Sequence, residues 1–475
     1  MKLKKTKIIA TFGPACSDPA TVRQLIEAGV NIFRLNFSHG DHEQHAGFIS
    51  TIRSVAGELS RPTAILGDLC GPKIRIGSFP EGNVELKPGQ SFTLYEDPSV
   101  PGSESGVGTS YPYLTKDLKP GARILLDDGN LSVEVEEVVE GGVLCKVIDG
   151  GLLKNHKGMN MPGSKLSVPS ITEKDKKDLA FILEQELDFV ALSFVRSAND
   201  IVELRELIGS SPIQVVAKIE KPEALDHFEA ILDQVDAIMI ARGDLGVEVE
   251  LQRVPQLQKF MLKRCFRRGV AVITATQMLE SMITNPRPTR AETTDVFNAV
   301  ADETDAVMLS GETAAGRYPV EAVKFMAAVA MEAEKLAIED ETWTRLLPEV
   351  ARDIEEIVAH SACSSAVDIG AKAIVAYTNS GATARYISKY HPPVPVVAMT
   401  PNEKISRQLA LSWGVWPIVV ESYSHAVEMV EQAEATVKRI GLAKPGDIIV
   451  IVAGLPLGTN ASSNIMKLHK VGPDQ

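Results

Sequence analysis

Ionisable side chains follow two short apolar runs near the middle of the sequence. One run leads into Lys218 and Glu220, and the next leads into Arg242 and Asp244. Continuous apolar runs are typical of buried parallel strands, and α/β proteins bind ligands at the carboxyl ends of such strands. Two carboxylates and two cations at these positions therefore indicate a site, because packing alone does not require them.

Polar residues also follow the other apolar runs that read as strands. If these strands close into a barrel, their carboxyl ends meet at one face. The further residues that would arrive there are Arg34, Asn36, Ser38, His39, Asp68, Thr276 and Ser310. Such a set suits phosphoryl transfer, because its transition state spreads negative charge over oxygens and needs fixed cations. Mg²⁺ binds through one or two carboxylates, which Glu220 and Asp244 could supply.

Each of these residues alone has a simpler explanation. Lys218 and Glu220 share one face of a strand and could form a surface ion pair. Arg34 could be a structural salt-bridge partner, and His39 a capping or packing residue. Their joint location favours a site. A phosphate loop is not supported, because the nearest match, Gly311–Gly316, is followed by Arg317.

Strands and amphipathic helices alternate along most of the chain. With residues 71–168 set aside, eight strand–helix units span roughly residues 1–340, which is the number and spacing of a TIM (β/α)8 barrel. A doubly wound open sheet is the alternative. The strands are expected at Lys7–Thr11, Ile32–Phe37, Ala64–Leu69, Phe189–Phe194, Val215–Glu220, Ala237–Arg242, Ala271–Thr276 and Ala306–Ser310. Capping-box spacings at Ser170–Glu173 and Thr289–Glu292 predict two of the helix starts.

The predicted fold class is α/β, with three domains. Residues 1–70 and 169–340 form the barrel, and the Gly- and Pro-rich residues 71–168 form an inserted, β-rich lid domain. An acidic connector at Ile338–Asp353 leads to a C-terminal α/β domain, residues 341–475. Its expected elements are a helix at Ile354–Gly370 and strands at Ala373–Tyr377, Val394–Met399 and, as the last strand, Asp447–Ala453.

Composition excludes several classes of protein. A net charge of −13 with dispersed Lys and Arg disfavours nucleic acid and anionic membranes as partners. The five cysteines lie far apart and form no C-x-x-C, which is typical of free thiols in a reducing cytoplasm. The apolar run near the N-terminus is too short for a secretory signal, so we expect neither export nor membrane insertion.

Several long motifs in one order resemble those of pyruvate kinases, over essentially the whole chain. They are Lys5–Ile8, Arg34–Gly40, Gly71–Arg75, Lys218–Glu220, Ala241–Gly246, Ala275–Met282, Pro288–Glu292 and Met308–Thr313. The resemblance implies a barrel with an inserted lid and a C-terminal regulatory domain. It also implies transfer of a phosphoryl group from phosphoenolpyruvate to ADP, giving pyruvate and ATP.

The resemblance also implies roles for single residues. Lys218 would lie beside the transferred phosphoryl group and then stabilise the enolate. Glu220 and Asp244 would hold Mg²⁺, with Mn²⁺ as an alternative. Phosphate would be bound by Arg34 and Arg75, and the substrate carboxylate by the backbone of Gly243 and Asp244 and the Thr276 hydroxyl, with Ser310 nearby. The nucleotide site would comprise Asn36, Phe37, Ser38, His39, Arg75 and the lid residue Lys157.

This chain departs from the commonest family pattern at the residues that bind a monovalent cation. Many family members carry Thr-Lys after the aspartate matching Asp68, and Glu at the position of Lys73, and there Asn36, Ser38 and Asp68 help to bind K⁺. This chain has Leu69-Cys70 and Lys73 instead, and Leu69 has no ligand atom. The resemblance to the branch with Gly-Pro-Lys-Ile-Arg implies that the Lys73 ammonium replaces K⁺, which is then not required. The alternative is that Lys73 is only a solvated charge at the lid hinge.

In the C-terminal domain, a polar loop lies between an expected strand and helix, where free N–H groups favour a phosphate. Its residues are Thr378, Asn379, Ser380, Gly381 and Thr383. In the family this loop and a later one, here near Gly454–Asn460, bind a phosphorylated effector. The resemblance thus implies allosteric regulation, and membership of the family would also imply a homotetramer.

Two other functions remain open at this stage. A divalent-metal barrel of the oxo-acid lyase kind would act on the same substrates without a nucleotide lid. A catalytically silent metabolite sensor is a further alternative, which the intact Lys218, Glu220, Asp244 and Thr276 disfavour.

Overall fold

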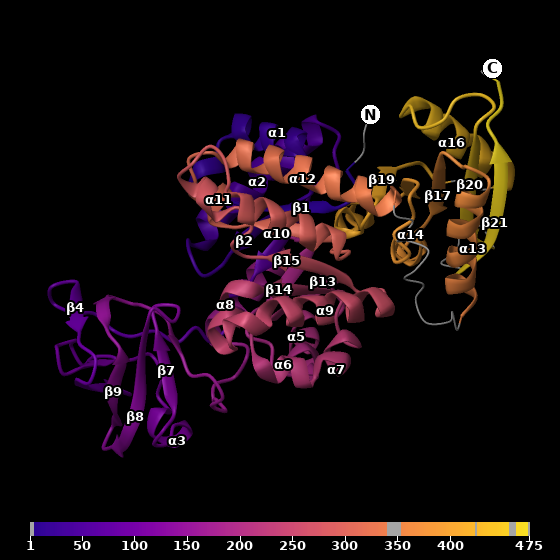
Figure 1. The fold of residues 1–475 in the computed structure, drawn as a ribbon. Helices are drawn as coiled ribbons and strands as arrows, with labels where there is room; N and C mark the ends of the chain where they lie inside the picture. Colours follow the sequence, from indigo (N-terminus) through magenta and orange to yellow (C-terminus); the bar gives the residue numbers. More distant parts are fainter. Residues whose placement is uncertain (1–3, 340–352, 423–424, 456–461, 474–475) are drawn as a thin grey trace.

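The computed structural model describes residues 4–339, 353–422, 425–455 and 462–473. Its barrel lies between the lid and the C-terminal domain, so the three predicted parts follow one another across the molecule (Figure 1). Within the described residues, every helix is too short or too polar to cross a membrane.

The barrel is closed and parallel, as the sequence predicts. Its strands are β1 (Lys7–Thr11), β2 (Ile32–Asn36), β3 (Ala64–Asp68), β12 (Phe189–Leu192), β13 (Gln214–Ile219), β14 (Ala237–Ala241), β15 (Ala271–Ala275) and β16 (Ala306–Leu309). Each is hydrogen-bonded to the next in the order β1-β16-β15-β14-β13-β12-β3-β2. The open-sheet alternative is therefore wrong. After β1, the strands end one or two residues earlier than predicted, so the ionisable residues lie at or just beyond the strand ends.

Helices surround the barrel. They are α1 (Pro19–Ala28), α2 (His42–Glu58), α4 (Glu173–Glu184), α5 (Ala198–Ile208), α6 (Pro222–Asp226), α7 (Phe228–Leu232), α8 (Arg242–Glu248), α9 (Val254–Arg268), α10 (Arg290–Ala301), α11 (Gly311–Ala314) and α12 (Pro319–Glu339), with short 3-10 turns at Pro14–Cys16, Leu251–Arg253 and Glu280–Ile283. The Thr289–Glu292 capping box is confirmed. The one predicted at Ser170–Glu173 is wrong in register, because Thr172 caps α4 and pairs with Asp175.

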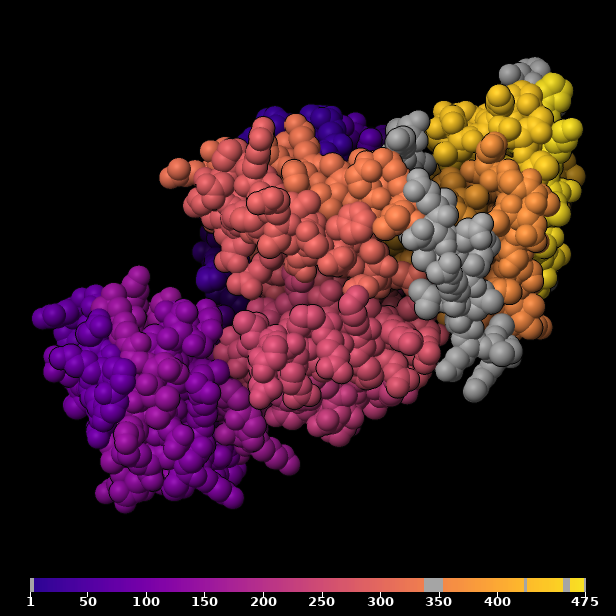
Figure 2. Space-filling view, in the orientation of Figure 1, coloured from indigo at the N-terminus to yellow at the C-terminus, as the bar shows by residue number. Residues whose placement is uncertain are grey.

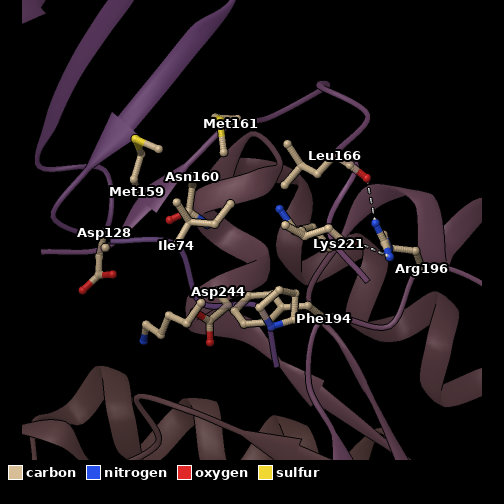
Figure 3. A pocket seen from close by; sticks show the side chains of 14 residues that line it. Ile74, Asp128, Met159, Asn160, Met161, Leu166, Phe194, Arg196, Lys221 and Asp244 are labelled. Atoms are coloured by element: carbon tan, nitrogen blue, oxygen red, sulfur yellow. Dashed lines mark hydrogen bonds between the residues drawn. The ribbon is translucent and has the colours of Figure 1, made fainter. Parts of the chain in front are cut away.

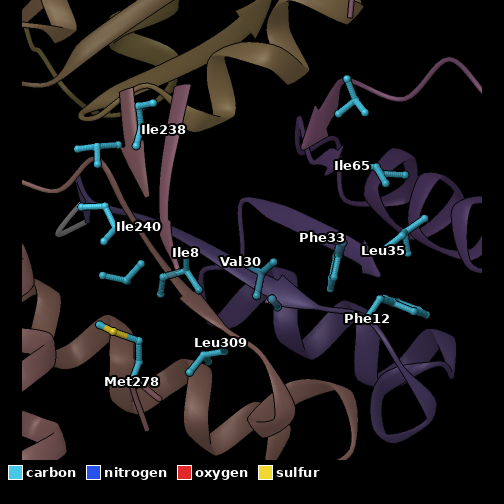
Figure 4. Close-up of a cluster of buried hydrophobic side chains, with 14 of the residues drawn as sticks. Ile8, Phe12, Val30, Phe33, Leu35, Ile65, Ile238, Ile240, Met278 and Leu309 are labelled. Carbon is cyan, nitrogen blue, oxygen red and sulfur yellow. The ribbon is translucent and has the colours of Figure 1, made fainter. Parts of the chain in front are cut away.

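Strand residues alternate between two cores. Outward side chains such as Phe33, Leu35 and Ile65 pack against the surrounding helices (Figure 4). Inward ones, among them Ile32 and Leu66, form a separate inner cluster. Because side chains alternate along a strand, the polar residues two positions further along also point inward. We call the end of the barrel at which the strands finish the upper end, and the end at which they begin the lower end. The barrel interior is therefore polar at its upper end and apolar in its middle.

The lid has its own core and its own sheets. Its elements are β4 (Asn83–Leu86), β5 (Ser91–Tyr95), β6 (Gly106–Gly108), α3 (Leu114–Asp117), β7 (Arg123–Leu126), β8 (Leu131–Val139), β9 (Gly142–Asp149), β10 (Gly151–Lys154) and β11 (Met159–Asn160). The order is β11-β7-β8-β9-β5-β6 in the larger sheet and β10-β4 in the smaller one. Figure 2 shows the lid projecting from the barrel and joined to it by a narrow neck.

Arg196 holds the segment that leads from the lid back to the barrel. Arg196 donates to the carbonyls of Leu166 and Val168, both at 3.0 Å, and to Ser170 Oγ at 2.7 Å. The segment that leads from the barrel into the lid is held by the Gly71 N–H, which donates to Asp175 Oδ1 at 3.1 Å. Both neck segments are thus tied to barrel elements.

The C-terminal domain contains a five-stranded sheet. Its elements are α13 (Ile354–Asp368), β17 (Ala373–Tyr377), α14 (Ala382–Ser388), β18 (Val396–Thr400), α15 (Glu403–Gln408), a 3-10 turn at Leu409–Leu411, β19 (Val415–Val419), α16 (Ala426–Arg439), β20 (Ile448–Gly454) and β21 (Ser463–Lys470). The order is β19-β18-β17-β20-β21. Most of the predicted connector, residues 340–352, lies outside the described residues.

Two edge strands of this sheet were not predicted, and the expectation that Asp447–Ala453 is the last strand is wrong. β21 follows it and pairs antiparallel with β20. β19 contains Pro417, which sequence patterns treat as a break, but an edge strand tolerates proline.

The C-terminal domain closes the lower end of the barrel. Ala410 and Leu411, both buried, join the inner cluster of barrel side chains. Two lysines near the start of β1 reach across the junction: Lys5 Nζ donates to the Pro393 carbonyl at 2.7 Å, and Lys7 Nζ to the Val415 carbonyl at 2.6 Å.

Candidate active site

Arg34 and Asp68 form an ion pair at the upper end of the barrel interior. Arg34 Nε lies 2.6 Å from Asp68 Oδ2, and Arg34 Nη1 donates to Thr11 Oγ1 at 3.0 Å. Asp68 is almost fully buried; burial favours its neutral form, but Lys218 and Arg34 outweigh this and lower its pKa. The three side chains come from adjacent strands, β1, β2 and β3, so the strand order itself brings them together.

Lys218 is a buried ammonium surrounded by oxygen atoms. Its Nζ donates to Ser193 Oγ at 2.7 Å and lies 3.0 Å from Glu220 Oε1 and 3.4 Å from Asp68 Oδ1. Burial lowers the pKa of Lys218, but the carboxylates of Asp68 and Glu220 raise it further than burial lowers it. The group is therefore a fixed positive charge, and the ion pair is buried rather than on the surface.

Glu220 accepts a hydrogen bond from Phe194, a residue with an unusual backbone conformation. The Phe194 N–H donates to Glu220 Oε2 at 2.7 Å, and Phe194 has a φ of 55°. A bulky residue in the left-handed region is strained, and such strain concentrates at functional sites. Burial raises the pKa of Glu220, as does the nearby Asp244 carboxylate, whereas Lys218 lowers it.

The Glu220 and Asp244 carboxylates fit a divalent cation that takes its other ligands from substrate. Glu220 Oε1 is buried and, apart from the Lys218 ammonium, has no hydrogen-bond donor within the described residues. Asp244 is partly exposed in the first turn of α8. Mg²⁺ usually binds through one or two protein carboxylates, and this pair could supply them.

Thr276 follows β15 with a φ of 69°, which is rare for a β-branched residue. Its hydroxyl accepts the Gly243 N–H at 2.7 Å and donates to the Ala275 carbonyl at 2.6 Å. Arg242 holds the same loop, because its guanidinium donates to the Thr276 carbonyl at 2.8 Å and lies 2.7 Å from Asp295 Oδ1. Arg242 is thus a structural residue, although its position at a strand end suggested a site residue.

Ser310 is positioned by a buried carboxylate. The Ser310 N–H donates to Glu312 Oε2 at 2.7 Å, and the Leu279 N–H donates to Glu312 Oε1 at 3.0 Å. Glu312 therefore ties together the loops that follow β15 and β16, next to Thr276. No pattern in the sequence indicates this bridging role of Glu312.

The residues predicted to bind nucleotide fall into two groups. Asn36, Ser38 and His39 lie at the end of β2, where Asn36 Oδ1 accepts the Ser38 N–H at 3.1 Å. Phe37 is buried, and its ring stacks on His45 with the ring centres 4.4 Å apart, so only its backbone is available. Burial lowers the pKa of His39, and the charges of three nearby cations, Arg75, Lys73 and Arg34, lower it further.

The second group belongs to the lid. Arg75 Nη1 donates to the His156 carbonyl at 2.9 Å, and Lys157 Nζ lies 2.7 Å from Asp127 Oδ1. Arg75 and Lys73 are close enough to His39 for their charges to lower its pKa. Lys157 remains paired within the lid.

A hollow lies between the barrel and the lid (Figure 3). It is lined by Asp244, Phe194 and Lys221 from the barrel and by Met159 and Asn160 from the lid. Lys73 also lines it. Lys221 Nζ lies 2.5 Å from Glu248 Oε1, which also accepts a hydrogen bond from Asn160 Nδ2 at 2.8 Å. This contact joins the lid to the barrel across the back of the hollow.

The predicted effector loop is a tight turn before α14. Thr378 Oγ1 accepts the Gly381 N–H at 2.8 Å, and Gly381 has a φ of 84°. The Thr383 and Ser463 hydroxyls lie 2.5 Å apart. The later loop, near Gly454–Asn460, lies mostly outside the described residues.

Sequence reasoning missed Ser193, Phe194 and Thr11. Ser193 could have been found, because alternation from the inward Phe189 and Ala191 places it on the inner face beside Lys218. Thr11 follows from the same alternation along β1. No sequence signal indicates the left-handed backbone of Phe194.

Comparisons with known proteins agree along the whole chain. The family model described as pyruvate kinase, barrel domain, matches residues 3–323, and that described as pyruvate kinase, alpha/beta domain, matches residues 356–469. The chain is 46% identical to a pyruvate kinase of Geobacillus stearothermophilus, over 98% of this chain and 80% of that protein. It is 42% identical to a pyruvate kinase of Clostridium acetobutylicum, over 99% of this chain and 100% of that protein. The crystal structure of a pyruvate kinase from Cryptosporidium parvum has a TM-score of 0.93 at 38% identity, covering 98% of this chain and 96% of that one.

Proposed function

The chain belongs to the pyruvate kinase family, and from that premise we propose which of its residues carry out the reaction. The enzyme transfers the phosphoryl group of phosphoenolpyruvate to ADP, giving pyruvate and ATP in glycolysis. The observation that carries the assignment is the buried Lys218 ammonium, kept charged by two carboxylates at the polar end of the barrel.

In the reaction, an oxygen of the ADP β-phosphate attacks phosphorus, and the bond from phosphorus to the enol oxygen breaks. The resulting enolate takes a proton at its methylene carbon to become pyruvate. Negative charge therefore develops first on the phosphoryl oxygens and then on the enolate oxygen. We propose that Lys218 stabilises both, because its ammonium is held in place by Ser193, Asp68 and Glu220 and needs no rearrangement.

Arg34 and Arg75 are proposed to bind phosphate from two sides. Arg34 is fixed to Asp68 on the barrel, while Arg75 lies in the lid segment before β4 and is held there by the His156 carbonyl. The substrate carboxylate is proposed to lie against the backbone of Gly243 and Asp244 and the Thr276 hydroxyl. The bond from the Gly243 N–H to Thr276 Oγ1 would then be exchanged for bonds to that carboxylate.

Pyruvate kinases generally use Mg²⁺. We propose that Glu220 and Asp244 hold it here, with Mn²⁺ as an alternative. A bound divalent cation would neutralise charge on the carboxylate and phosphate oxygens of the substrate. The support is the sparsely hydrogen-bonded Glu220 Oε1, together with the influence of Asp244 on the pKa of Glu220.

The nucleotide is proposed to bind between the end of β2 and the lid. Asn36, the Phe37 backbone, Ser38 and His39 would contact it from the barrel, and Arg75 and Lys157 from the lid. Because Lys157 pairs with Asp127 in this structure, its contact would require that pair to open.

We further propose that Lys73 replaces the monovalent cation, so that K⁺ is not required. Lys73 is exposed, lines the hollow beside Asp244, and contributes to the lowered pKa of His39. The Leu69 side chain is buried in the outer core and offers no oxygen ligand. Asp68, a K⁺ ligand in other members, is engaged here by Arg34 and Lys218.

Regulation, assembly and location are proposed from the family. An effector with a phosphate would bind the loop at Thr378–Thr383, and the chain would form a homotetramer in the cytoplasm. Exposed apolar side chains such as Leu251 at 72%, Ile354 at 64% and Val427 at 69% are available for contacts between subunits. Free cysteines, as all five are, suit a reducing compartment.

A coupled assay tests the proposed function. Phosphoenolpyruvate is supplied with Mg²⁺, with or without ADP, and pyruvate formation is followed. Strict dependence on ADP is expected, because the phosphoryl group needs an acceptor. Pyruvate release without ADP would instead indicate a lyase-type or hydrolytic enzyme. Omitting K⁺ from all buffers tests the proposal about Lys73 in the same assay.

A further inference from the structure

The loop of residues 37–39, which follows β2, is held by side chains from two helices. Lys174, in the first turn of α4, donates from Nζ to the Phe37 carbonyl at 2.6 Å. His45 of α2 lies with Nε2 3.0 Å from the His39 carbonyl. A carbonyl oxygen only accepts hydrogen bonds, so this Nε2 carries the proton. The carbonyls at both ends of the loop are thus fixed by side chains that lie outside it.

Lys174 is itself directed by a buried carboxylate. Asp178, one turn later in α4, has Oδ2 2.6 Å from Lys174 Nζ, and its Oδ1 lies 2.8 Å from Nε2 of His42 at the start of α2. The Asp178 side chain is only 5% exposed, whereas that of Lys174 is 55% exposed. The ammonium therefore points at the loop because a fixed group orients it, unlike an ordinary surface lysine.

His45 gives the loop a second, more deeply buried support. Its ring stacks on that of Phe37 with the ring centres 4.4 Å apart, and only 4% of the residue is exposed. Burial lowers the pKa of His45, so the ring stays neutral near pH 7. A change at His45 would disturb the core as well as the loop. Lys174, which is exposed, can be replaced without opening a cavity.

The next residue of α4 holds the other half of the proposed nucleotide site. Asp175 is fully buried, and its Oδ1 accepts the Gly71 N–H at 3.1 Å. Gly71 begins the segment that carries Arg75 into the lid, and a Cβ added to Gly71 would lie 3.0 Å from the Phe194 ring. Lys174 and Asp175 are neighbours in one helical turn. This turn therefore fixes the barrel segment and the lid segment relative to each other.

We propose that Lys174 is a positioning residue for ADP. Through the Phe37 carbonyl it fixes Ser38 and His39, and together with Asp175 it sets their spacing from Arg75. Lys174 itself touches neither the nucleotide nor the reacting atoms. The inference rests on the nucleotide site proposed above, and it gives a role to a residue outside that site.

Steady-state kinetics of Lys174→Met test the proposal. Without the ammonium, the loop is free to leave the geometry that ADP requires, so KM for ADP should rise by about tenfold. KM for phosphoenolpyruvate, measured at saturating ADP, should stay within about twofold, because the contacts of Lys174 do not include the residues proposed to bind that substrate. A general loss of stability would not separate the two constants in this way.

Two further single variants serve as controls. Lys174→Arg keeps a charged donor for the Phe37 carbonyl and should restore most of the affinity for ADP. Lys177→Met removes another exposed lysine from the same helix and should leave both KM values unchanged.

A double variant separates positioning from direct contact. His39→Ala removes a proposed nucleotide contact and should raise KM for ADP on its own. In the Lys174→Met background His39 is no longer held in place, so His39→Ala should have little further effect. If Lys174 contacted the nucleotide independently, the two effects would multiply.

Two results would overturn the proposal. One is a wild-type KM for ADP in Lys174→Met, and the other is multiplication of the two effects in the double variant. Failure of the proposed function is a different result, because it would appear in the wild type as pyruvate formation that does not depend on ADP. That result would remove the basis of both proposals.

Discussion

The two ends of the barrel hold buried lysines in opposite ways. At the upper end, Asp68 and Glu220 outweigh burial and raise the pKa of Lys218, so its ammonium stays charged. At the lower end, burial dominates and lowers the pKa of Lys7 to about 7; Lys4 lowers it further, and Glu334 and Asp305 only partly oppose this. Lys7 instead donates to a neutral carbonyl, that of Val415.

The opposite pKa shifts suit different tasks: Lys218 keeps a positive charge, whereas Lys7 serves as a hydrogen-bond donor within the structure. A carboxylate pair maintains a cation that can stabilise developing negative charge, whereas a carbonyl needs only a hydrogen-bond donor. Both lysines are buried near strands of one barrel, so burial alone does not distinguish them. The neighbouring carboxylates favour Lys218 for the proposed catalytic role.

Replacing Lys218 should have the largest effect. Lys218→Met removes the proposed charge stabilisation, and kcat should fall by about 10³-fold or more, while circular dichroism shows a folded protein. Lys7→Met is the matched control at the other end and should keep kcat within about twofold. Comparable losses of kcat in the two variants would contradict the proposal that only the lysine at the upper end takes part in the reaction.

Breaking the ion pair between Arg407 and Asp188, whose Nε and Oδ1 atoms lie 2.8 Å apart, should reduce stability and not turnover. Arg407→Met leaves the buried Asp188 carboxylate without its arginine, which should destabilise the protein by about 3 kcal/mol. Calorimetric unfolding measures this, and the coupled assay measures turnover at a temperature where the variant is folded. If kcat fell as strongly as in Lys218→Met, the lower end would also belong to the catalytic machinery.

Reversing the charge at Lys73 should alter the response to K⁺. Lys73→Glu removes the proposed internal cation and places there the residue that K⁺-dependent members carry, so K⁺ should stimulate activity by about tenfold, equivalent to about 1.4 kcal/mol. The wild type and Lys87→Glu, which changes an exposed lid lysine, should show no stimulation. A strong response of the wild type to K⁺ would refute the substitution.

The lower end should also give a small pH effect. Because the folded-state pKa of Lys7 is about 7 and its ordinary value is 10.5, the unfolded state binds more protons between these values. Stability from this group is therefore lost as pH falls toward 7 and recovered as pH rises. From pH 7 to pH 8 the wild type should gain roughly 1 kcal/mol relative to Lys7→Met, measured by denaturant unfolding. Parallel curves for the two proteins would contradict the lowered pKa.

The sequence predicted the barrel, and the closed parallel sheet confirms it. Apolar runs end in charged residues, and alternation along a strand places Arg34, Asp68 and Lys218 on one inner face, where they are in contact; their roles stay predictions. The sequence also predicted β17 to the residue. These are local patterns, and the barrel topology converts them into a common site.

Features that depend on contacts between residues far apart in the chain could not be predicted from the sequence. The edge strand β21 is exposed at half of its residues and buried only at Ser463, so it lacks the apolar run of a buried strand. The left-handed backbone of Phe194 depends on Glu220, 26 residues later in the chain. The pairing of Lys157 with Asp127 depends on how the lid folds, and nothing around Lys157 in the sequence indicates it.

The contribution of Leu411 to the barrel interior has a consequence for synthesis. The ribosome completes every barrel strand before it makes residue 411, so the lower opening of the newly formed barrel has no plug at that stage. Domains usually fold in order as they emerge, but here the apolar interior is completed only by a residue of the last domain. A fragment that ends after α12 would therefore expose an apolar opening, and it should need a chaperone more than the whole chain does.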